Sequence, residues 1–131
     1  MTDKELVAAA WKAREMHSAL FSKFPVGAAL ETAEGKVYLG ANIESSSYGL
    51  SCCAERVALF KALTEGEKNF ARIAIAVKSK KPPVSPCGAC RQLLADYALN
   101  VDVLLSDEPG KFQKLSLREL LPLPFTPEQL L

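Results

Sequence analysis

The chain has 131 residues, of which 49% are hydrophobic and 24% charged, and its formal net charge at pH 7 is +1. This length suits a single domain spanning residues 1–131, with the composition of a globular protein. The near-neutral charge argues against a dedicated nucleic-acid binder, whose binding face is usually strongly basic. The opening residues carry Asp3, Lys4 and Glu5 in an amphipathic stretch, so we expect a cytoplasmic protein with no secretion signal and no membrane segment.

The first predicted elements are a helix and a hairpin. Apolar side chains recur at helical spacing from Leu6 onward, after Thr2 as a possible N-cap with Glu5 three residues later. Residues 26–32 and 36–43 are rich in strand-forming and small residues and flank a short turn. They are predicted to pair as a β-hairpin.

The rest of the chain alternates helices and strands. The residues around Ile75 are almost wholly apolar, which predicts a strand covered on both faces. The expected elements are a helix over 53–65 that stops at Gly66, a strand over 73–77, a loop over 80–83, a helix over 87–98, strands over 101–105 and 111–115, and a short helix over 117–121 before a proline-rich tail. This order predicts an α/β fold, in which a mixed sheet of roughly five strands lies between two helical layers.

Two short stretches carry the chemistry: Cys-Ala-Glu at 53–55 and Pro-Cys-Gly-Ala-Cys at 86–90. Cys87 and Cys90 are three residues apart, so on a helix they share a face and can bind one ion. Each stretch follows a predicted strand, so both helix N-termini should meet at the carboxyl edge of the sheet, where α/β folds bind ligands. Catalytic zinc typically has three protein ligands and one open position. The pattern therefore predicts a zinc site with Cys53, Cys87 and Cys90 as ligands.

A carboxylate lies next to this predicted site. Glu55 stands inside an otherwise apolar run, where a charge is costly unless it has a function. Two residues past Cys53, it can converge with that thiol only at a helix N-terminus. Glu55 is therefore the candidate proton carrier.

Simpler interpretations remain open beside this one. The cysteine pair at 87 and 90 could be redox-active, and a purely structural zinc module could use the same thiols. That module would need a fourth ligand, and Cys52 is the only spare cysteine. A single-stranded RNA binder is a further alternative. Taken alone, Phe24 is typical of a core residue, and Asn42 and Glu44 of polar residues at a strand end.

In these motifs the chain resembles the zinc-dependent cytidine deaminases, specifically the small type that forms homotetramers. The resemblance rests on Cys-Ala-Glu followed by Pro-Cys-x-x-Cys. It extends to Phe-Ser-Lys-Phe-Pro-Val-Gly-Ala-Ala at 21–29, Asn-Ile-Glu at 42–44, and Leu-Leu-Pro at 120–122 followed by Phe125. Two departures are Phe21, where the family has tyrosine, and Ser45, where asparagine is common.

The resemblance implies an activity and a set of roles. The activity is hydrolysis of cytidine, and of deoxycytidine, to the uridine product and ammonia in pyrimidine salvage, with one Zn²⁺ per subunit. The active sites of the tetramer would lie at subunit interfaces. The implied roles are proton transfer for Glu55, base binding for Phe24 and the Ala54 backbone, ribose binding for Asn42 and Glu44, and a contact in a neighbouring subunit's pocket for Phe125. A deaminase of another aminopyrimidine nucleoside, such as blasticidin S, is the alternative.

Charge counting adds Arg56 to the site. Three thiolates around Zn²⁺ leave a net charge of about −1, which raises the pKa of bound water where hydroxide is needed. Arg56 follows Glu55 in the first helical turn, so it can fold back toward Cys53 and offset this charge. Arg91, directly after Cys90, has a weaker claim to the same role and is expected instead to be a solvated residue of the helix surface.

Overall fold

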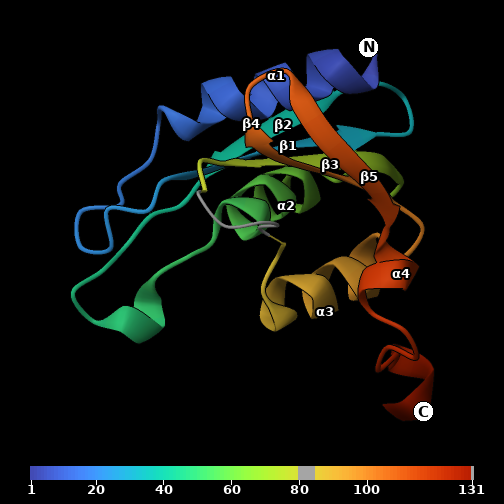
Figure 1. Cartoon of the computed structure of the whole chain (residues 1–131). Coiled ribbons are helices and arrows are strands. Elements are labelled where there is room, and N and C mark those ends of the chain that lie inside the picture. Colours follow the sequence, from blue (N-terminus) through green and yellow to red (C-terminus); the bar gives the residue numbers. More distant parts are fainter. Residues whose placement is uncertain (80–84, 131) are drawn as a thin grey trace.

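The computed structural model describes residues 1–79 and 85–130. A five-stranded mixed sheet in the order β2-β1-β3-β4-β5 lies between helices (Figure 1), which confirms the predicted α/β architecture. The strands are β1 Val26–Thr32, β2 Val37–Ala41, β3 Phe70–Val77, β4 Asp102–Glu108 and β5 Lys111–Ser116. The helices are α1 Asp3–Arg14, α2 Ala54–Thr64, α3 Gly88–Tyr97 and α4 Leu117–Leu120, with 3₁₀ turns η1 Tyr48–Leu50 and η2 Pro127–Leu130.

The strand directions bring two helix starts to one edge of the sheet. β1 pairs antiparallel with both β2 and β3, so β2 and β3 run in the same direction. β3 then pairs parallel with β4 through α3, and β5 closes the sheet antiparallel to β4. Because α2 follows β2 and α3 follows β3, both helices begin beyond the carboxyl ends of their strands, as the sequence predicted.

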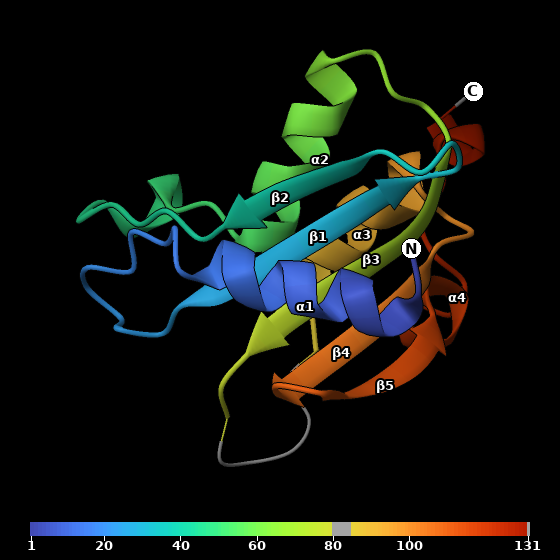
Figure 2. The ribbon, with the colours of Figure 1, turned by 90° about the horizontal axis from the view of Figure 1, so that it is seen from above.

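The helices divide between the two faces of the sheet. In Figure 2, α1 lies across one face, whereas α2 and α3 lie on the other. Leu6, Val7 and Ala10 of α1 form a buried cluster with small residues of the sheet such as Ala29 and Ala74. The second, larger cluster joins α2, α3 and α4 to the opposite face. β3 is thus covered on both sides, which explains its nearly unbroken run of apolar residues.

Two glycines allow the helices to approach the sheet directly. A Cβ atom at Gly27 would lie 2.1 Å from the carbonyl oxygen of Ala10 in α1. A Cβ atom at Gly40 would lie 2.4 Å from the carbonyl oxygen of Ala54 in the first turn of α2. Each helix therefore rests on a strand at a point where no side chain intervenes.

The helix starts agree with their sequence signals. Thr2 and Glu5 form a capping box at the start of α1, as predicted. Cys53 and Cys87 are the N-cap residues of α2 and α3, and neither uses its side chain to cap the helix. The two thiols are therefore free for another partner.

Several details differ from the sequence-based expectation or lie outside it. β3 begins at Phe70 rather than at residue 73, and β4 extends to Glu108 rather than ending at residue 105. β2 ends at Ala41 rather than at residue 43, because Ile43 leaves the sheet to form isolated bridges with Ser18 and Cys52. The proline-rich tail includes the short turn η2. The loop predicted at 80–83 lies outside the described residues. Within the described ranges, no helix is long and apolar enough to cross a membrane.

Candidate active site

Three cysteine thiols converge where α2 and α3 begin. The Sγ atoms of Cys53, Cys87 and Cys90 all lie within 4.8 Å of one another, and those of Cys87 and Cys90 are 3.5 Å apart. Zn–S bonds of about 2.3 Å in tetrahedral geometry separate sulfurs by about 3.8 Å, so this cluster can accept zinc with small adjustments. Within residues 1–79 and 85–130 it is the one group of three or more potential ligands, and no fourth residue joins it.

The electrostatics of the cluster also favour a cation. The pKa of Cys53 is lowered to about 5, chiefly by its hydrogen bond with Cys90, with a further contribution from Arg56. The pKa of Cys90 is raised by this same hydrogen bond and by burial. Cys53 is thus the thiol of the cluster that most readily becomes a thiolate, the form that binds a metal ion. The N-termini of α2 and α3 add positive potential that stabilises thiolates.

Arg56 occupies the position expected from its sequence. Its Nη2 donates a hydrogen bond to Cys53 Sγ at 3.3 Å. Its Nε atom is buried and has no hydrogen-bond partner among the described residues. One N–H of the guanidinium group thus already donates to a ligand sulfur. The Nε–H is a second donor that has no partner among the described residues.

Glu55 is a buried acid in the first turn of α2. Its side chain is only 6% exposed. Burial raises its pKa to about 7, and the negative charge of Cys53 adds to this effect. A carboxyl group with a pKa near neutrality can both accept and return a proton under physiological conditions.

A cavity of about 450 Å³ joins the thiols to the predicted binding residues. This volume is ordinary for a small-molecule site. Its lining residues are Ser22, Phe24, Val26, Asn42, Glu44, Cys53, Ala54, Glu55, Ile75, Ser85 and Cys87. Phe24, Asn42, Glu44, Ala54 and Glu55, predicted from sequence, therefore face one space. Ser22 and Ser85 were not predicted, although Ser22 lies within the motif at 21–29 and Ser85 directly precedes the motif at 86–90.

Asn42 holds the segment that carries Phe24. Its Oδ1 accepts a hydrogen bond from the Val26 N–H, and its Nδ2 donates one to the Phe24 carbonyl, each at 2.9 Å. Its side-chain amide still has one N–H and one oxygen lone pair uncommitted. Asn42 thus fixes the rim of the cavity and retains a free donor and acceptor.

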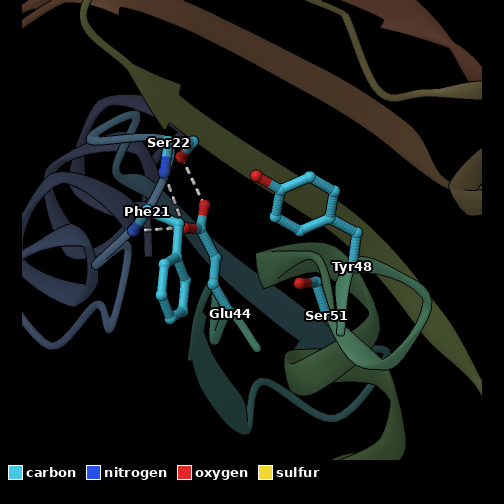
Figure 3. Close-up of a pocket in the computed structure, with 5 residues that line it drawn as sticks. All are labelled: Phe21, Ser22, Glu44, Tyr48 and Ser51. Atoms are coloured by element: carbon cyan, nitrogen blue, oxygen red, sulfur yellow. Dashed lines mark hydrogen bonds between the residues drawn. The ribbon is translucent and has the colours of Figure 1, made fainter. Parts of the chain in front are cut away.

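Glu44 holds the start of the same segment. Its carboxylate accepts hydrogen bonds from the backbone N–H groups of Phe21 and Ser22, at 3.0 and 2.9 Å, and from the Ser22 hydroxyl (Figure 3). These hydrogen bonds lower the pKa of Glu44, with Ser22 as the largest contributor. A second cavity of about 430 Å³ adjoins this carboxylate and is also lined by Tyr48 and Ser51. The anionic Glu44 side chain therefore borders both cavities.

Other residues singled out in the sequence lie elsewhere. Phe125 is absent from the described lining of the 450 Å³ cavity; it is 52% exposed on the C-terminal segment, beside α3. Arg91 corrects our expectation of a solvated surface residue, because its guanidinium group is partly buried and bonded to three oxygen atoms. Cys52 is outside the thiol cluster.

Comparison with known proteins adds to this geometry. The family described as "Cytidine and deoxycytidylate deaminase zinc-binding region" matches residues 1–104, a span that contains all three thiols and Glu55. The chain belongs to the cytidine deaminase family. Zinc is accordingly the ion of the Cys53, Cys87 and Cys90 cluster.

Members of the cytidine deaminase family match the chain over nearly its whole length. It is 43% identical to a cytidine deaminase of Sporosarcina psychrophila over 99% of this chain and 96% of that protein. It is 45% identical to one of Halalkalibacterium halodurans, over 99% and 98%. The crystal structure of a Burkholderia pseudomallei cytidine deaminase superposes with a TM-score of 0.91 and 44% identity, covering 95% of this chain and all of that one. A blasticidin-S deaminase of Bacillus cereus is 36% identical over 80% of this chain and 79% of that protein.

Proposed function

We propose that this protein hydrolyses cytidine and deoxycytidine to uridine and deoxyuridine, with release of ammonia. The observation that carries the proposal is the position of Glu55. This buried carboxyl group lines the same cavity as Cys53 and Cys87, and its pKa is raised to about 7. The names of the full-length relatives support cytidine as the substrate.

Glu55 supplies the proton transfers that hydrolysis needs. Water adds its oxygen to C4 of the pyrimidine, and the bond between C4 and the exocyclic nitrogen breaks. The carboxylate takes one proton from the water and gives it to ring N3, and then moves the second proton to the departing nitrogen, which leaves as ammonia. Zinc, when bound by the three thiolates, acts as a Lewis acid that lowers the pKa of water at its open position.

The remaining residues of the cavity would orient the nucleoside. The Ala54 N–H belongs to the first turn of α2, which has no acceptor within the helix, so it can bind the edge of the base. Phe24 is 46% exposed and can lie against the pyrimidine ring. The uncommitted donor and acceptor of Asn42, together with the Glu44 carboxylate, suit ribose hydroxyl groups.

Two alternatives are less well supported. A structural zinc module would use four protein ligands, and the described residues offer only three. Blasticidin S remains a candidate substrate because one relative acts on it by name, but that relative matches less of the chain than the cytidine deaminases do.

The direct test is a nucleoside panel. Purified protein with one equivalent of zinc should convert cytidine and deoxycytidine, measured by loss of cytidine absorbance and by ammonia release. Activity should disappear after treatment with a chelator and return when zinc is added. Blasticidin S and a short single-stranded RNA are included as competing substrates. Faster turnover of blasticidin S than of cytidine would replace the proposed substrate.

We also propose a homotetramer in which neighbouring subunits complete each active site. Large apolar side chains are exposed in the single chain on segments 20–24 and 43–50, which also supply Phe24 and Glu44 to the cavity lining. The exposed residues are Leu20, Phe21, Phe24, Ile43, Tyr48 and Leu50, all between 46% and 80% exposed. Such a patch is typical of an interface. Phe125, remote from its own cavity, would enter the cavity of a neighbour.

Subunit mixing tests this arrangement. In an oligomer made only of Phe125→Ala subunits, every active site should be impaired. In an oligomer made only of Glu55→Gln subunits, every active site should be inactive. A hybrid contains sites with an intact Glu55 from one subunit and an intact Phe125 from the next, so mixed oligomers should be more active than the sum of the parents. Native mass spectrometry verifies hybrid formation. Hybrids that show no gain would place Phe125 outside the neighbour's site.

A further inference from the structure

Each of the three guanidinium nitrogens of Arg91 donates a hydrogen bond to a different oxygen atom. Nε donates to the Pro86 carbonyl at 2.8 Å, Nη2 to the Ser85 hydroxyl at 2.8 Å, and Nη1 to the Leu120 carbonyl at 2.5 Å. The first two acceptors lie immediately before Cys87. The third lies at the end of α4, in the C-terminal segment.

The hydrogen bonds from Arg91 fix the backbone immediately before the zinc ligand Cys87. The Pro86 carbonyl shares a peptide plane with the Cys87 nitrogen, so holding this oxygen sets the orientation of the Cys87 backbone. Pro86 is buried, and the hydrogen bond from Arg91 gives its carbonyl a partner. Cys87 itself is exposed, and its side chain makes no capping hydrogen bond to α3. Its backbone is held on one side by α3, where the Arg91 N–H donates to the Cys87 carbonyl at 3.0 Å, and on the other side by the segment that precedes it.

The contacts of Arg91 separate it from Arg56. Arg56 donates to a ligand sulfur, whereas the side-chain bonds described for Arg91 all go to oxygen. A planar fork with three separate acceptors is a geometric restraint that a lysine cannot reproduce. The positive charge alone would not fix Pro86 and Leu120 relative to each other.

We infer that Arg91 is a positioning residue for the zinc site, which clamps the Ser85–Pro86 segment to the end of α4 and so holds Cys87 in place to bind the metal. The C-terminal segment thereby contributes to metal retention although it supplies no ligand. The inference rests on zinc ligation by Cys87 and not on the proposed reaction, so a test that follows the metal is independent of the substrate.

The test measures zinc release from intact holoprotein into excess chromogenic chelator. Arg91→Lys keeps the charge and Arg91→Met removes it. Both should release zinc faster than wild type by about 10- to 100-fold, the usual effect of removing a group that supports a metal ligand. Ser85→Ala removes one of the three acceptors. This variant should fold more readily than the Arg91 variants, and it should accelerate zinc release by less than they do.

The matched control is Arg118→Lys. Arg118 is an exposed residue of α4 whose side-chain hydrogen bonds within the described residues all go to Asn100 Oδ1, at 3.1 and 3.2 Å, so its replacement should leave zinc release unchanged. Cobalt-substituted protein gives a second readout, since its visible spectrum reports thiolate geometry and should change in Arg91→Lys and not in Arg118→Lys. Wild-type release and an unchanged spectrum in Arg91→Lys would overturn the inference. Normal release in Arg91→Lys with fast release in Arg91→Met would assign the effect to charge.

Discussion

Among the individual residues, Glu55 is an ionisable group held in an environment that disfavours its charge. Its pKa rises from the ordinary 4.5 to about 7 because the side chain is buried. A raised carboxyl pKa stabilises the fold at low pH, and this contribution is lost as the pH rises from 4.5 through 7, because the unfolded chain then releases the proton that the folded state still holds. Glu55 therefore lowers the stability of the metal-free protein at neutral pH.

We predict that Glu55→Gln retains zinc but loses catalysis by at least about 10²- to 10⁴-fold, since an amide cannot carry protons. The same variant, stripped of metal, should be more stable than wild type by about 3 kcal/mol at pH 8 and nearly equal to it at pH 4.5. Urea unfolding at the two pH values measures the difference. Glu65→Gln, an exposed carboxyl group at the end of α2, is the control and should change neither property. Substantial turnover by Glu55→Gln would remove Glu55 from the mechanism.

Arg56 permits a second prediction about the site. Arg56→Gln removes a donor from Cys53 Sγ and leaves the negative charge of the thiolates less compensated. The variant should retain zinc, lose about tenfold or more in kcat, and shift its activity profile toward higher pH. Arg56→Lys, which keeps the charge, should show a smaller shift. If kcat and the pH profile stay at wild-type values, the helix N-termini alone compensate the thiolates.

The sequence allowed some residues of the site to be predicted and concealed others. Cys53, Cys87, Cys90 and Glu55 stand in two short motifs, so their spacing was enough to predict that they meet. The partners of Arg91 could not be predicted in this way, because one of them is a backbone carbonyl 29 residues away. The hydrogen bonds of Asn42 to the Phe24 segment were hidden for the same reason, since backbone donors and acceptors leave no mark in sequence.

Among the elements, the contact between β2 and α2 determines where the catalytic turn lies. Gly40 faces the backbone of Ala54 and Ala58, so nothing but a hydrogen atom fits between the strand and the helix. Gly27 has the same relation to α1 on the opposite face. The two glycines therefore form a matched pair, of which only Gly40 lies against the helix that carries Cys53 and Glu55.

We predict that Gly40→Ala and Gly27→Ala each lower the free energy of unfolding by about 1–3 kcal/mol or more, because a methyl group would overlap backbone atoms. Gly40→Ala should also weaken zinc binding and lower kcat, since α2 must move away from β2. Gly27→Ala should retain near-normal zinc affinity. Chemical unfolding and zinc titration of both variants make the comparison. Equal zinc affinity in the two variants would show that α2 can shift without disturbing the thiols.

Element types were predicted better than element ends. The capping box of α1 and the hairpin turn have local signals, and both were confirmed. The early end of β2 has no such signal, because Ile43 pairs with Ser18 and Cys52 instead of continuing the sheet. Such tertiary pairing overrides the strand propensity of the segment.

In the whole molecule, a network of charges ties the beginning of the chain to the sheet. Arg72 in β3 bonds Asp3 and Glu31, each at 2.7 Å, and Lys114 in β5 lies 3.2 Å from Asp3. The hydrogen bond from Arg72 is the largest cause of the lowered pKa of Asp3. A lowered carboxyl pKa gives stability that is present above the ordinary value of 3.8 and is lost as the pH falls through the folded value.

We predict that Asp3→Asn lowers the free energy of unfolding by about 1 kcal/mol at pH 7 and has little effect at pH 2.5. The loss at pH 7 should shrink in high salt, because part of the network is exposed. Glu108→Gln breaks an exposed ion pair with Lys111 and should cost almost nothing, which makes it the control. A loss in Asp3→Asn that persists unchanged at pH 2.5 would indicate lost packing rather than lost charge.

The sheet order shows the limit of sequence-based prediction for the whole fold. The hairpin and the parallel β3–β4 pair follow from element order, whereas the antiparallel pairing of β1 with β3 joins segments about 40 residues apart. No local pattern specifies that pairing. It is selected by burial, since the small residues of both strands let α1 pack closely on one face.

The distribution of the thiols along the chain also orders the events of synthesis. Cys53 leaves the ribosome 34 residues before Cys87, an interval of about 2–7 s at typical elongation rates. Leu120, the last anchor of Arg91, emerges later still. We therefore expect the nascent protein to present an open pair of helix starts to cellular zinc before its final segment arrives to close behind the metal.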